Sequence, residues 1–318
     1  MNRAAEHRTA EEVLEQHAAA PIEGVDRRLA GIINAPEWTD VIKVQQFDKP
    51  KTWRLVCGGD GEEAKEEVVF LVQGSVVEKD LPPILSKPRM PVEKYKYLRQ
   101  YIKISGLGTP TFEAALQSTG EIYGQFDRNF PDGALEGWSA ANSQGTGGDV
   151  LEASNRYMVQ RRDASGSDIP FGELVDPKKI LEGMARDSQQ VHTDDNEVLY
   201  FKRRTGDDGK HVYEKVGPQM FRVGDIVELQ VTFVVVPLKG DRYKMMSVLR
   251  SIALIDGSFS QPATTKRSVD SQGPTLLKRK VMYEQTSDAS NEGRASKRGA
   301  MDVDVESRKT ARGHLETK

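Results

Sequence analysis

Alternating apolar and polar positions between Phe221 and Gly257 are the strongest structural signal in the chain. Within 225–236 every second residue is large and apolar, namely Val227, Leu229, Val231, Phe233 and Val235. A repeat of two with many β-branched residues predicts a strand that buries one face. A return strand is predicted over 244–255, with its apolar set at Met246, Val248, Ile252 and Leu254. The residues between them, PLKGDR, predict a turn, so we expect a long antiparallel hairpin.

The hairpin also carries charges that need partners. Arg250 interrupts the apolar set, and a guanidinium in that position needs a carboxylate, a carbonyl or a phosphate. An internal ion pair and an anion contact in a groove both fit this requirement. Lys239, Arg242, Tyr243 and Lys244 place positive charge and an aromatic ring at the hairpin tip. Lysines at such tips also serve solubility.

Shorter patterns predict further strands and one helix. The strand candidates lie within 41–47, 52–56, 66–80, 191–204 and 211–215. Residues 176–187, DPKKILEGMARD, predict a short helix that Asp176 caps and in which Pro177 takes the first position. Between 109 and 144, glycine and proline punctuate the chain and predict short pieces.

A basic and aromatic stretch at 87–103 follows a proline-rich connection. It holds six basic residues and three tyrosines against the single acid Glu93. The stretch fits a helix that ends at Gly106, and it also fits a strand that places its tyrosines on one face with Arg99 and Lys103. Of these two alternatives we favour the strand.

Stacking of bases on aromatic rings, with phosphates neutralised by nearby cations, is what single-strand binding requires, and each stacked base is worth about 1–3 kcal/mol. This stretch and the hairpin therefore supply the candidate nucleic-acid contacts, which are Lys94, Tyr95, Lys96, Tyr97, Arg99, Tyr101, Lys103, Lys239, Arg242, Tyr243, Lys244 and Arg250. A solvated basic face with its tyrosines packed inward explains the same residues without a ligand.

Charge is unevenly distributed along the 318 residues. Residues 261–318 carry 12 Lys and Arg against 8 Asp and Glu, and residues 1–260 carry 33 against 40. An acidic body argues against a globally basic nucleic-acid binder, so binding would have to use a local patch. The pattern predicts a frayed or disordered arm at 1–30, a β-rich domain at 31–260 and a disordered basic tail. Residues 143–148 could divide the domain into two lobes.

No constellation of residues predicts catalysis. Cys57 is the only cysteine, which excludes an intramolecular disulfide and a cysteine-rich zinc site and fits a reducing compartment. His192 with Asp194 and Asp195 can suggest a metal or base site, although polar residues that enter a strand are typical of a turn. We therefore predict no enzyme, no cofactor and no metal. No apolar run of about 18 residues occurs, so we expect an intracellular protein without a membrane partner.

The tail contains short basic clusters whose spacing resembles a two-part nuclear import signal. Their residues are Lys278, Arg279, Lys280, Lys297, Arg298, Arg308 and Lys309. They predict a nuclear import receptor as a partner and the nucleus as the location, with the cytoplasm as the alternative.

Three pieces of the chain carry a resemblance to known proteins, namely DPKKILEGM, VHTDDNEVLYF and the segment from Phe221 to Ser260. They look like a large family of uncharacterised proteins of mushroom-forming fungi. The resemblance implies a eukaryotic, nuclear-capable setting and no particular chemistry. Separately, the long strand, basic turn and return strand are similar to the final hairpin of single-strand-binding OB barrels. We expect a mainly β protein with minor α (α+β), built as an antiparallel OB-like barrel or sandwich with a long C-terminal hairpin and disordered termini.

Two functions follow from these observations. The first is a non-catalytic nuclear protein that binds single-stranded nucleic acid through its basic and aromatic residues. The alternative is a protein–protein interaction or scaffold module, in which the long hairpin pairs with a partner. The sequence leaves the choice between DNA and RNA, and the oligomeric state, open.

Overall fold

The structure is a computed structural model that describes residues 2–18, 27–35, 37–58, 65–142, 148–164, 166–206 and 211–260. These residues belong to one compact unit within residues 1–270. Its helices are α1 (Asn2–Ala18), α2 (Trp38–Val41), α3 (Pro110–Asp127) and α4 (Ile180–Asp187), with the 3₁₀ turns η1 (Leu29–Asn34), η2 (Val92–Tyr97), η3 (Arg161–Asp163), η4 (Asp194–Asn196) and η5 (Pro218–Met220). Its strands are β1 (Lys43–Asp48), β2 (Lys51–Cys57), β3 (Glu66–Glu67), β4 (Phe70–Asp80), β5 (Arg99–Ser105), β6 (Ala141–Asn142), β7 (Asp149–Arg156), β8 (Val159–Gln160), β9 (Gln190–Val191), β10 (Leu199–Thr205), β11 (His211–Lys215), β12 (Ile226–Pro237) and β13 (Tyr243–Asp256).

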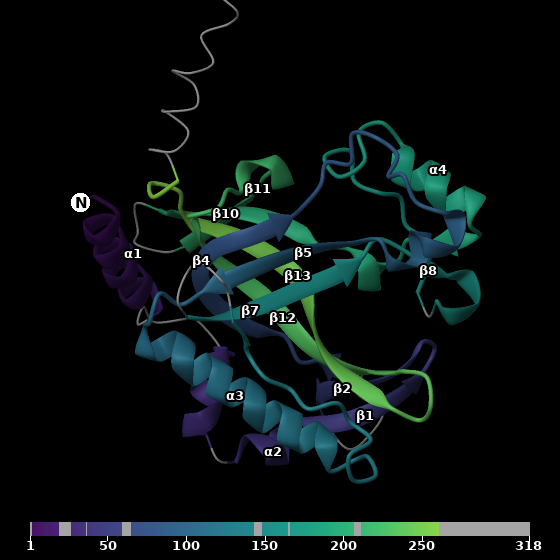
Figure 1. Ribbon diagram of the computed structural model, residues 1–318, viewed down its shortest axis with the longest axis horizontal. Coiled ribbons are helices and arrows are strands. Elements are labelled where there is room, and N and C mark those ends of the chain that lie inside the picture. Colours follow the sequence, from purple (N-terminus) through teal and green to yellow (C-terminus); the bar gives the residue numbers. More distant parts are fainter. Residues whose placement is uncertain are drawn as a thin grey trace, which may run out of the picture. The chain divides into compact units, whose positions relative to one another are not determined.

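Five strands close into a barrel, seen from one side in Figure 1. β12 pairs with β4, β4 with β5, β5 with β7, β7 with β13, and β13 pairs again with β12. Every pairing in this ring is antiparallel except that of β7 with β13. By chain position the ring runs first, second, third, fifth and fourth, which is the Greek-key arrangement of an OB barrel. The prediction of a mainly β, OB-like barrel is confirmed.

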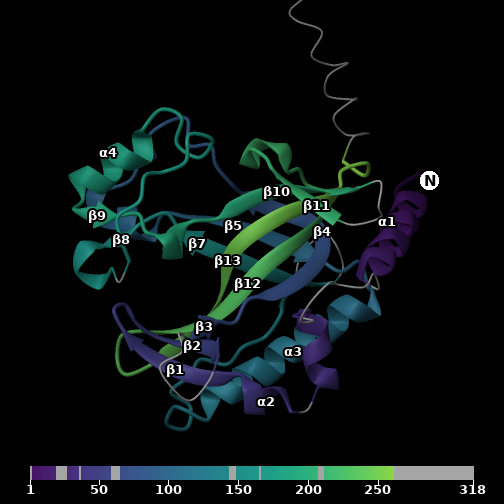
Figure 2. The same ribbon diagram turned by 180° about the vertical axis from the view of Figure 1, so that it is seen from behind.

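Further strands extend the barrel on both sides of the long hairpin (Figure 2). β2 pairs with the C-terminal part of β12 and also with β1 and β3. β10 runs parallel to β13 and pairs with β11. The path of paired strands therefore ends in β1 on one side and in β11 on the other.

β12 follows the period-two prediction closely. Its predicted inward set is fully buried, and this set comprises Val227, Leu229, Val231, Phe233 and Val235. Val234, on the opposite face, is 4% exposed, so this end of the strand is buried on both faces, as the apolar residues at Val234 and Val236 predict. The strand therefore reads as mainly apolar towards its C-terminal end.

β13 contains a β-bulge at Arg250. Two successive residues of β12 lie opposite Leu249 and opposite the residue that follows Arg250, so no residue of β12 lies opposite Arg250 itself. An extra residue in one strand reverses the faces of the residues on one side of it. Met245 and Leu249 are buried, whereas Met246 and Val248 are only half-buried. The prediction that Met246 and Val248 form the inward set is therefore wrong.

α3 is the largest departure from the predicted elements, since short pieces were expected in this region. Pro110 takes the first turn of the helix, where its missing N–H is not needed. The buried side chains recur at steps of three and four, namely Phe112, Ala115, Leu116, Ser118, Thr119, Ile122 and Phe126. Gly120 and Gly124 lie away from the core, because a Cβ added at either would meet no atom. They interrupt the sequence pattern without ending the helix.

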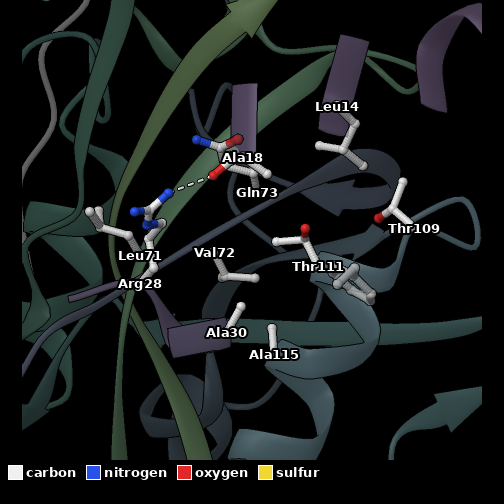
Figure 3. A pocket seen from close by; sticks show the side chains of 11 residues that line it. Leu14, Ala18, Arg28, Ala30, Leu71, Val72, Gln73, Thr109, Thr111 and Ala115 are labelled. Atoms are coloured by element: carbon white, nitrogen blue, oxygen red, sulfur yellow. Dashed lines mark hydrogen bonds between the residues drawn. The ribbon is translucent and has the colours of Figure 1, made fainter. Parts of the chain in front are cut away.

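α1 packs against β4 and α3, as Figure 3 shows from close by. Leu14 is 1% exposed, and the Glu15 carboxylate accepts hydrogen bonds from Thr111 N and Oγ1 at 3.2 and 2.8 Å. Arg28 Nη1 donates to the Ala18 carbonyl at 2.7 Å. Between Ala10 and Ala18 this arm is better buried than its composition predicts. The cavity that remains beneath it is about 30 Å³, on the order of a single water, and too small for a ligand.

A second hydrophobic cluster lies beyond the end of β7 and includes α4. Its buried members are Tyr95, Tyr157, Met158, Leu181, Met184 and Ala185. α4 begins at Ile180, so Pro177 precedes the helix and does not take its first position. Asp176 nevertheless accepts hydrogen bonds from the backbone N–H groups of Ile180 and Glu182 at 2.7 and 2.9 Å. Asp176 therefore caps the helix as predicted, although it lies before the first helical residue.

Two remaining expectations concern local structure. Residues 99–105 form the favoured strand (β5), so the alternative of a helix that ends at Gly106 is wrong, and Tyr95 and Tyr97 lie in a preceding 3₁₀ turn (η2) and not on the strand. Residues 143–147 lie outside the described residues, and β6 and β7 on either side of them pair as a hairpin. The tail from residue 261 also lies outside the described residues.

Candidate nucleic-acid interface

β5 and β7, the second and third strands of the barrel, present a polar face outward. Gln100, Ile102 and Ile104 of β5 are buried and alternate with side chains that are exposed or half-exposed. The strand register places these outer residues of β5 opposite the outer residues of β7. The resulting β5–β7 face consists of Arg99, Tyr101, Lys103, Glu152, Ser154 and Arg156.

Acidic side chains neutralise the centre of the β5–β7 face. Lys103 Nζ lies 2.7 Å from Glu78 Oε2 and 3.7 Å from Glu152 Oε2. The Tyr101 hydroxyl donates to Glu78 Oε1 at 2.7 Å. These hydrogen bonds, first that of Lys103 and then that of Tyr101, lower the pKa of Glu78, so Glu78 is ionised at neutral pH. Lys103 and Tyr101 therefore already have partners within the protein.

The edge of this face, where the first barrel loop (residues 81–98) enters β5, is more open. Tyr97 is 59% exposed, and Lys96 Nζ lies 5.0 Å from the centroid of its ring. Lys94 is exposed as well, and within the described ranges neither lysine forms an ion pair. An exposed ring beside cations is the arrangement that stacks a nucleic-acid base.

Arg99 and Arg156 stand directly opposite each other at this edge. Arg99 pairs with Glu152 at 3.4 Å, whereas Arg156 has no ion-pair partner in the part of the chain that the structure describes. Loss of hydration lowers the pKa of Arg156; Tyr97 opposes this shift and the charge of Arg99 adds to it. Like charges in directly opposed positions are destabilising, and an anion between them would relieve the repulsion.

Arg156 is not among the contacts that the sequence predicts. No local pattern around Arg156 marks it, because its neighbours along the chain belong to a different stretch from the basic residues at 87–103. Only the register of β5 with β7 brings Arg156 beside Arg99. A correct pairing of the two strands would have been needed to find it.

Tyr95 does not belong to the open edge. Its ring is 3% exposed within the second hydrophobic cluster, and Lys87 Nζ lies 5.6 Å from the ring centroid. A 3₁₀ turn has about three residues per turn, so residues two apart, such as Tyr95 and Tyr97, point in different directions. Tyr95 is a core residue, and its predicted contact with a base is not compatible with this burial.

Charged side chains of the hairpin tip (residues 238–242) and of the adjoining start of β13 form ion pairs with the segment that follows α3. Arg242 Nη2 lies 2.6 Å from Glu136 Oε1, and Lys244 Nζ lies 4.0 Å from Glu136 Oε2. Lys239 is exposed. Arg242 and Lys244 therefore share one carboxylate, which offsets only one of their two charges.

The ring of Tyr243 is also engaged within the protein. It lies 4.4 Å from the ring of Phe130 and 5.1 Å from that of Trp53, centroid to centroid. The tip follows Pro237 at one end of β12, whereas β4 leads into the first barrel loop at the other end, where Ile226 lies opposite Ser75. The structure therefore separates the two sets of candidates that the sequence combined.

Arg250 forms internal ion pairs, one of the two alternatives that the sequence left open. Its Nη2 lies 2.6 Å from Glu67 Oε2 and 3.3 Å from Asp195 Oδ1, and Arg54 Nη2 lies 2.8 Å from Asp195 Oδ2. Burial alone would raise the pKa of Asp195, but the hydrogen bond and charge of Arg54, together with Arg250, lower it overall. The Arg250 side chain is 15% exposed, and its charge is balanced inside the protein.

The residues around His192 form a structured turn. His192 Nδ1 lies 2.7 Å from the Tyr157 carbonyl oxygen, and Thr193 and Asn196 form a capping box at η4. Among the described residues no three His, Cys, Asp or Glu side chains are grouped so that they could hold a metal ion. Of the helices described, none is long and apolar enough to cross a membrane.

Comparisons with known proteins add little to this picture. No protein-family model and no curated protein matches the chain, so the resemblance to fungal proteins stays a prediction. Among solved structures, the chain is similar to gp2.5, a single-stranded DNA-binding protein encoded by bacteriophage T7, with a TM-score of 0.27 and 10% identity over 59% of this chain and 86% of that one. A likeness of this size carries no functional argument. The strand pairing and the open edge themselves define an OB-type barrel with a small basic and aromatic surface.

Proposed function

We propose that the chain is a non-catalytic nucleic-acid-binding protein that contacts single strands through the open edge of the β5–β7 face. The observation that carries this proposal is the opposed pair Arg99 and Arg156 beside the exposed ring of Tyr97. In OB barrels the second and third strands, with the loop between the first and second, are a common oligonucleotide surface. The proposed contacts are Lys94, Lys96, Tyr97, Arg99 and Arg156.

Each side chain has a role in this binding. A phosphate between Arg99 and Arg156 would accept charge-assisted hydrogen bonds and remove the repulsion between the two guanidinium groups. A base would stack on Tyr97, which is worth about 1–3 kcal/mol. Lys94 and Lys96 would neutralise neighbouring phosphates of the same strand.

Carboxylates on the same face limit the affinity. Glu152 pairs with Arg99 at 3.4 Å, so an incoming phosphate must compete with it. Residues 1–260 also carry more acidic than basic side chains. We expect modest affinity with a strong salt dependence, and neutralisation of two or three phosphates would give a slope of about −1.4 to −2.1 in log K against log salt.

Fluorescence anisotropy of the full chain with labelled single-stranded DNA, single-stranded RNA and duplex tests the proposal. We expect single strands to bind more tightly than duplex and Tyr97→Ala to weaken them about tenfold. The matched control removes two exposed lysines from β1 and β11, Lys43→Ala with Lys215→Ala. Unchanged affinity in Tyr97→Ala and in Arg156→Ala would remove the proposed interface.

We also propose nuclear import through the basic tail, supported by the sequence alone. The tail lies outside the described residues. A fluorescent fusion in which Lys278, Arg279 and Lys280 are replaced by alanine should lose nuclear accumulation. In a second fusion the cluster from Lys297 to Lys309 is replaced as well. An unchanged nuclear signal in that fusion would contradict import through the tail.

Protein binding is the second candidate function. The observation that favours it concerns β11 and not the long hairpin, which the sequence suggested as the strand that pairs with a partner. The outer edges of the long hairpin are paired over part of their length, β12 with β4 and β2, and β13 with β10 and, at Val248, with β7. β11 is a terminal strand whose five residues are all exposed, and such edges can accept a strand from a partner. Association that survives nuclease and high salt, and that is lost on Val212→Pro, would favour this function.

A further inference from the structure

A cleft lies between α4 and the segment that follows β7, outside the β5–β7 face. Its volume is about 710 Å³. Its polar lining residues are Gln160, Arg161, Arg162, Arg186, Gln189 and Gln190. Three arginines and three carboxamides thus line one cleft, and among the described residues no carboxylate lines it. This composition favours an anionic ligand with additional hydrogen-bonding groups.

The three arginines have only exposed acidic neighbours. The pairs are Arg161 with Asp168 at 3.1 Å, Arg162 with Asp163 at 3.7 Å and Arg186 with Glu182 at 3.3 Å. The arginine side chains are 70% to 83% exposed. Surface pairs of this kind contribute little to stability, so the guanidinium groups are free to exchange their carboxylates for a phosphate.

Gln190 is a buried polar side chain at the wall of the arginine cleft. It is 5% exposed, and its Oε1 accepts no hydrogen bond from any residue that the structure describes. A buried carboxamide oxygen without a donor is unfavourable. Gln190 lines the arginine cleft and also an adjoining cleft of about 530 Å³. Because this oxygen is shielded from solvent, a ligand N–H or O–H group would reach the carboxamide only after the Gln190 side chain turned towards the cleft.

The adjoining cleft has charged side chains in its lining, Asp168, Lys179 and Glu182 among them, and one aromatic wall. The ring of Phe171 is stacked on that of His192, with 4.2 Å between centroids and 20° between planes. His192 Nδ1 bonds to the Tyr157 carbonyl at 2.7 Å, and burial lowers the pKa of His192. The imidazole is therefore neutral at pH 7 and fixed in orientation. The half-buried Phe171 ring can take a planar group, such as a nucleobase.

We propose that this cleft binds a phosphate-bearing nucleotide, with its phosphate on Arg161, Arg162 and Arg186. Guanidinium groups recognise phosphate through paired hydrogen bonds. The base would lie towards Phe171, and the Gln190 side chain would turn into the cleft to accept from one of its donors. A free nucleotide and the phosphorylated end of a strand share this chemistry. The site does not depend on the β5–β7 face, so it can be present whether or not that face binds single strands.

Isothermal titration calorimetry of the full chain tests the cleft with nucleoside monophosphates, inorganic phosphate, and short oligonucleotides with and without a 5′ phosphate. We expect a nucleotide or a 5′-phosphorylated strand to bind more tightly than inorganic phosphate or the unphosphorylated strand. Arg162→Ala with Arg186→Ala should weaken this binding at least about tenfold, since two charge-assisted contacts are lost. Gln190→Met, which keeps the side-chain volume, should weaken it several-fold, with thermal unfolding as the check on folding.

Two controls separate this site from the proposed function. Lys43→Ala with Lys215→Ala removes the same charge elsewhere and should leave nucleotide binding unchanged. Tyr97→Ala should also leave it unchanged, while it weakens binding of unphosphorylated single strands. Binding by the phosphorylated strand alone supports the cleft as a site for strand ends. Native affinity in the double arginine variant, loss of nucleotide binding in Tyr97→Ala, or no binding of any phosphorylated probe at millimolar concentration would overturn the proposal.

Discussion

The hairpin end around residues 239–250 and the first barrel loop have similar compositions, but their side chains have different surroundings. Both combine lysine, arginine and tyrosine. At the hairpin end Arg242 and Lys244 both pair with Glu136, and Tyr243 packs against other rings. At the loop, Tyr97 is exposed and the neighbouring arginines face each other. Composition alone did not distinguish a charge that holds the fold from one that is available to a ligand.

The two regions differ in which acidic and aromatic side chains from distant parts of the chain lie next to them. Glu136 follows α3, and Asp195 sits in η4, so each reaches the hairpin only through the tertiary fold. The open edge has Glu152 as a partner for Arg99 but leaves Arg156 with a like charge opposite it. We therefore expect substitutions in the hairpin to change stability and substitutions at the open edge to change binding.

Arg250→Ala should have the largest effect on stability. It leaves Glu67 and Asp195 to share Arg54, and removal of one member of a largely buried ion-pair network costs about 3 kcal/mol. Urea unfolding measures this loss, and single-strand binding of the folded variant should be unchanged. A variant as stable as the native chain would show that the network contributes nothing.

Tyr243→Ala and Tyr97→Ala form a matched pair across the two regions. Truncation of the packed Tyr243 ring should lower the free energy of unfolding by about 2 kcal/mol and leave binding intact. Truncation of the exposed Tyr97 ring should leave the free energy of unfolding within about 0.5 kcal/mol and weaken single-strand binding by about 1–2 kcal/mol. Loss of binding in Tyr243→Ala together with loss of stability in Tyr97→Ala would contradict the comparison.

The pH dependence of stability should reflect the hairpin network. The folded pKa of Asp195 is lower than its ordinary value, so its contribution is complete above the unfolded pKa of about 3.9 and is lost as the pH falls through the folded pKa. Thermal unfolding of the native chain and of Asp195→Asn should therefore differ most at neutral pH and converge in acid. A constant difference down to pH 2 would rule out this role.

Arg156→Ala should give the smallest change, because it removes one phosphate contact. The slope of log K against log salt should become shallower by about 0.7 for a single strand. Stability should be unchanged or slightly higher, since a like charge opposite Arg99 is removed. Anisotropy titrations at several salt concentrations measure the slope, and Lys215→Ala serves as the control, with the native slope expected.

The barrel was predictable because its longest strands carry their own signal. The period-two set of β12 identified the hairpin, and the glycine-bearing turn fixed where the chain reverses. The bulge at Arg250 was not predictable, because an extra residue changes only the pairing. α3 was missed since Gly120 and Gly124 resemble breaks in the sequence but lie away from the core.

The open edge was only half predictable for a related reason. Tyr97 and Lys96 belong to one basic stretch, which composition identified. Which tyrosine of that stretch is exposed depends on the short turn η2 and on the cluster that covers Tyr95. Arg156 enters the edge only through strand register, and such long-range pairing leaves no mark in the local sequence.

Photocrosslinking tests the central claim most directly. A bromouracil-substituted single strand, irradiated with the full chain and mapped by peptide mass spectrometry, reports which aromatic residue contacts a base. We predict a crosslink at Tyr97, lost in Tyr97→Ala and suppressed by unlabelled single strand. Crosslinks confined to Tyr243 and the hairpin tip, or no competable crosslink at any site, would contradict the account.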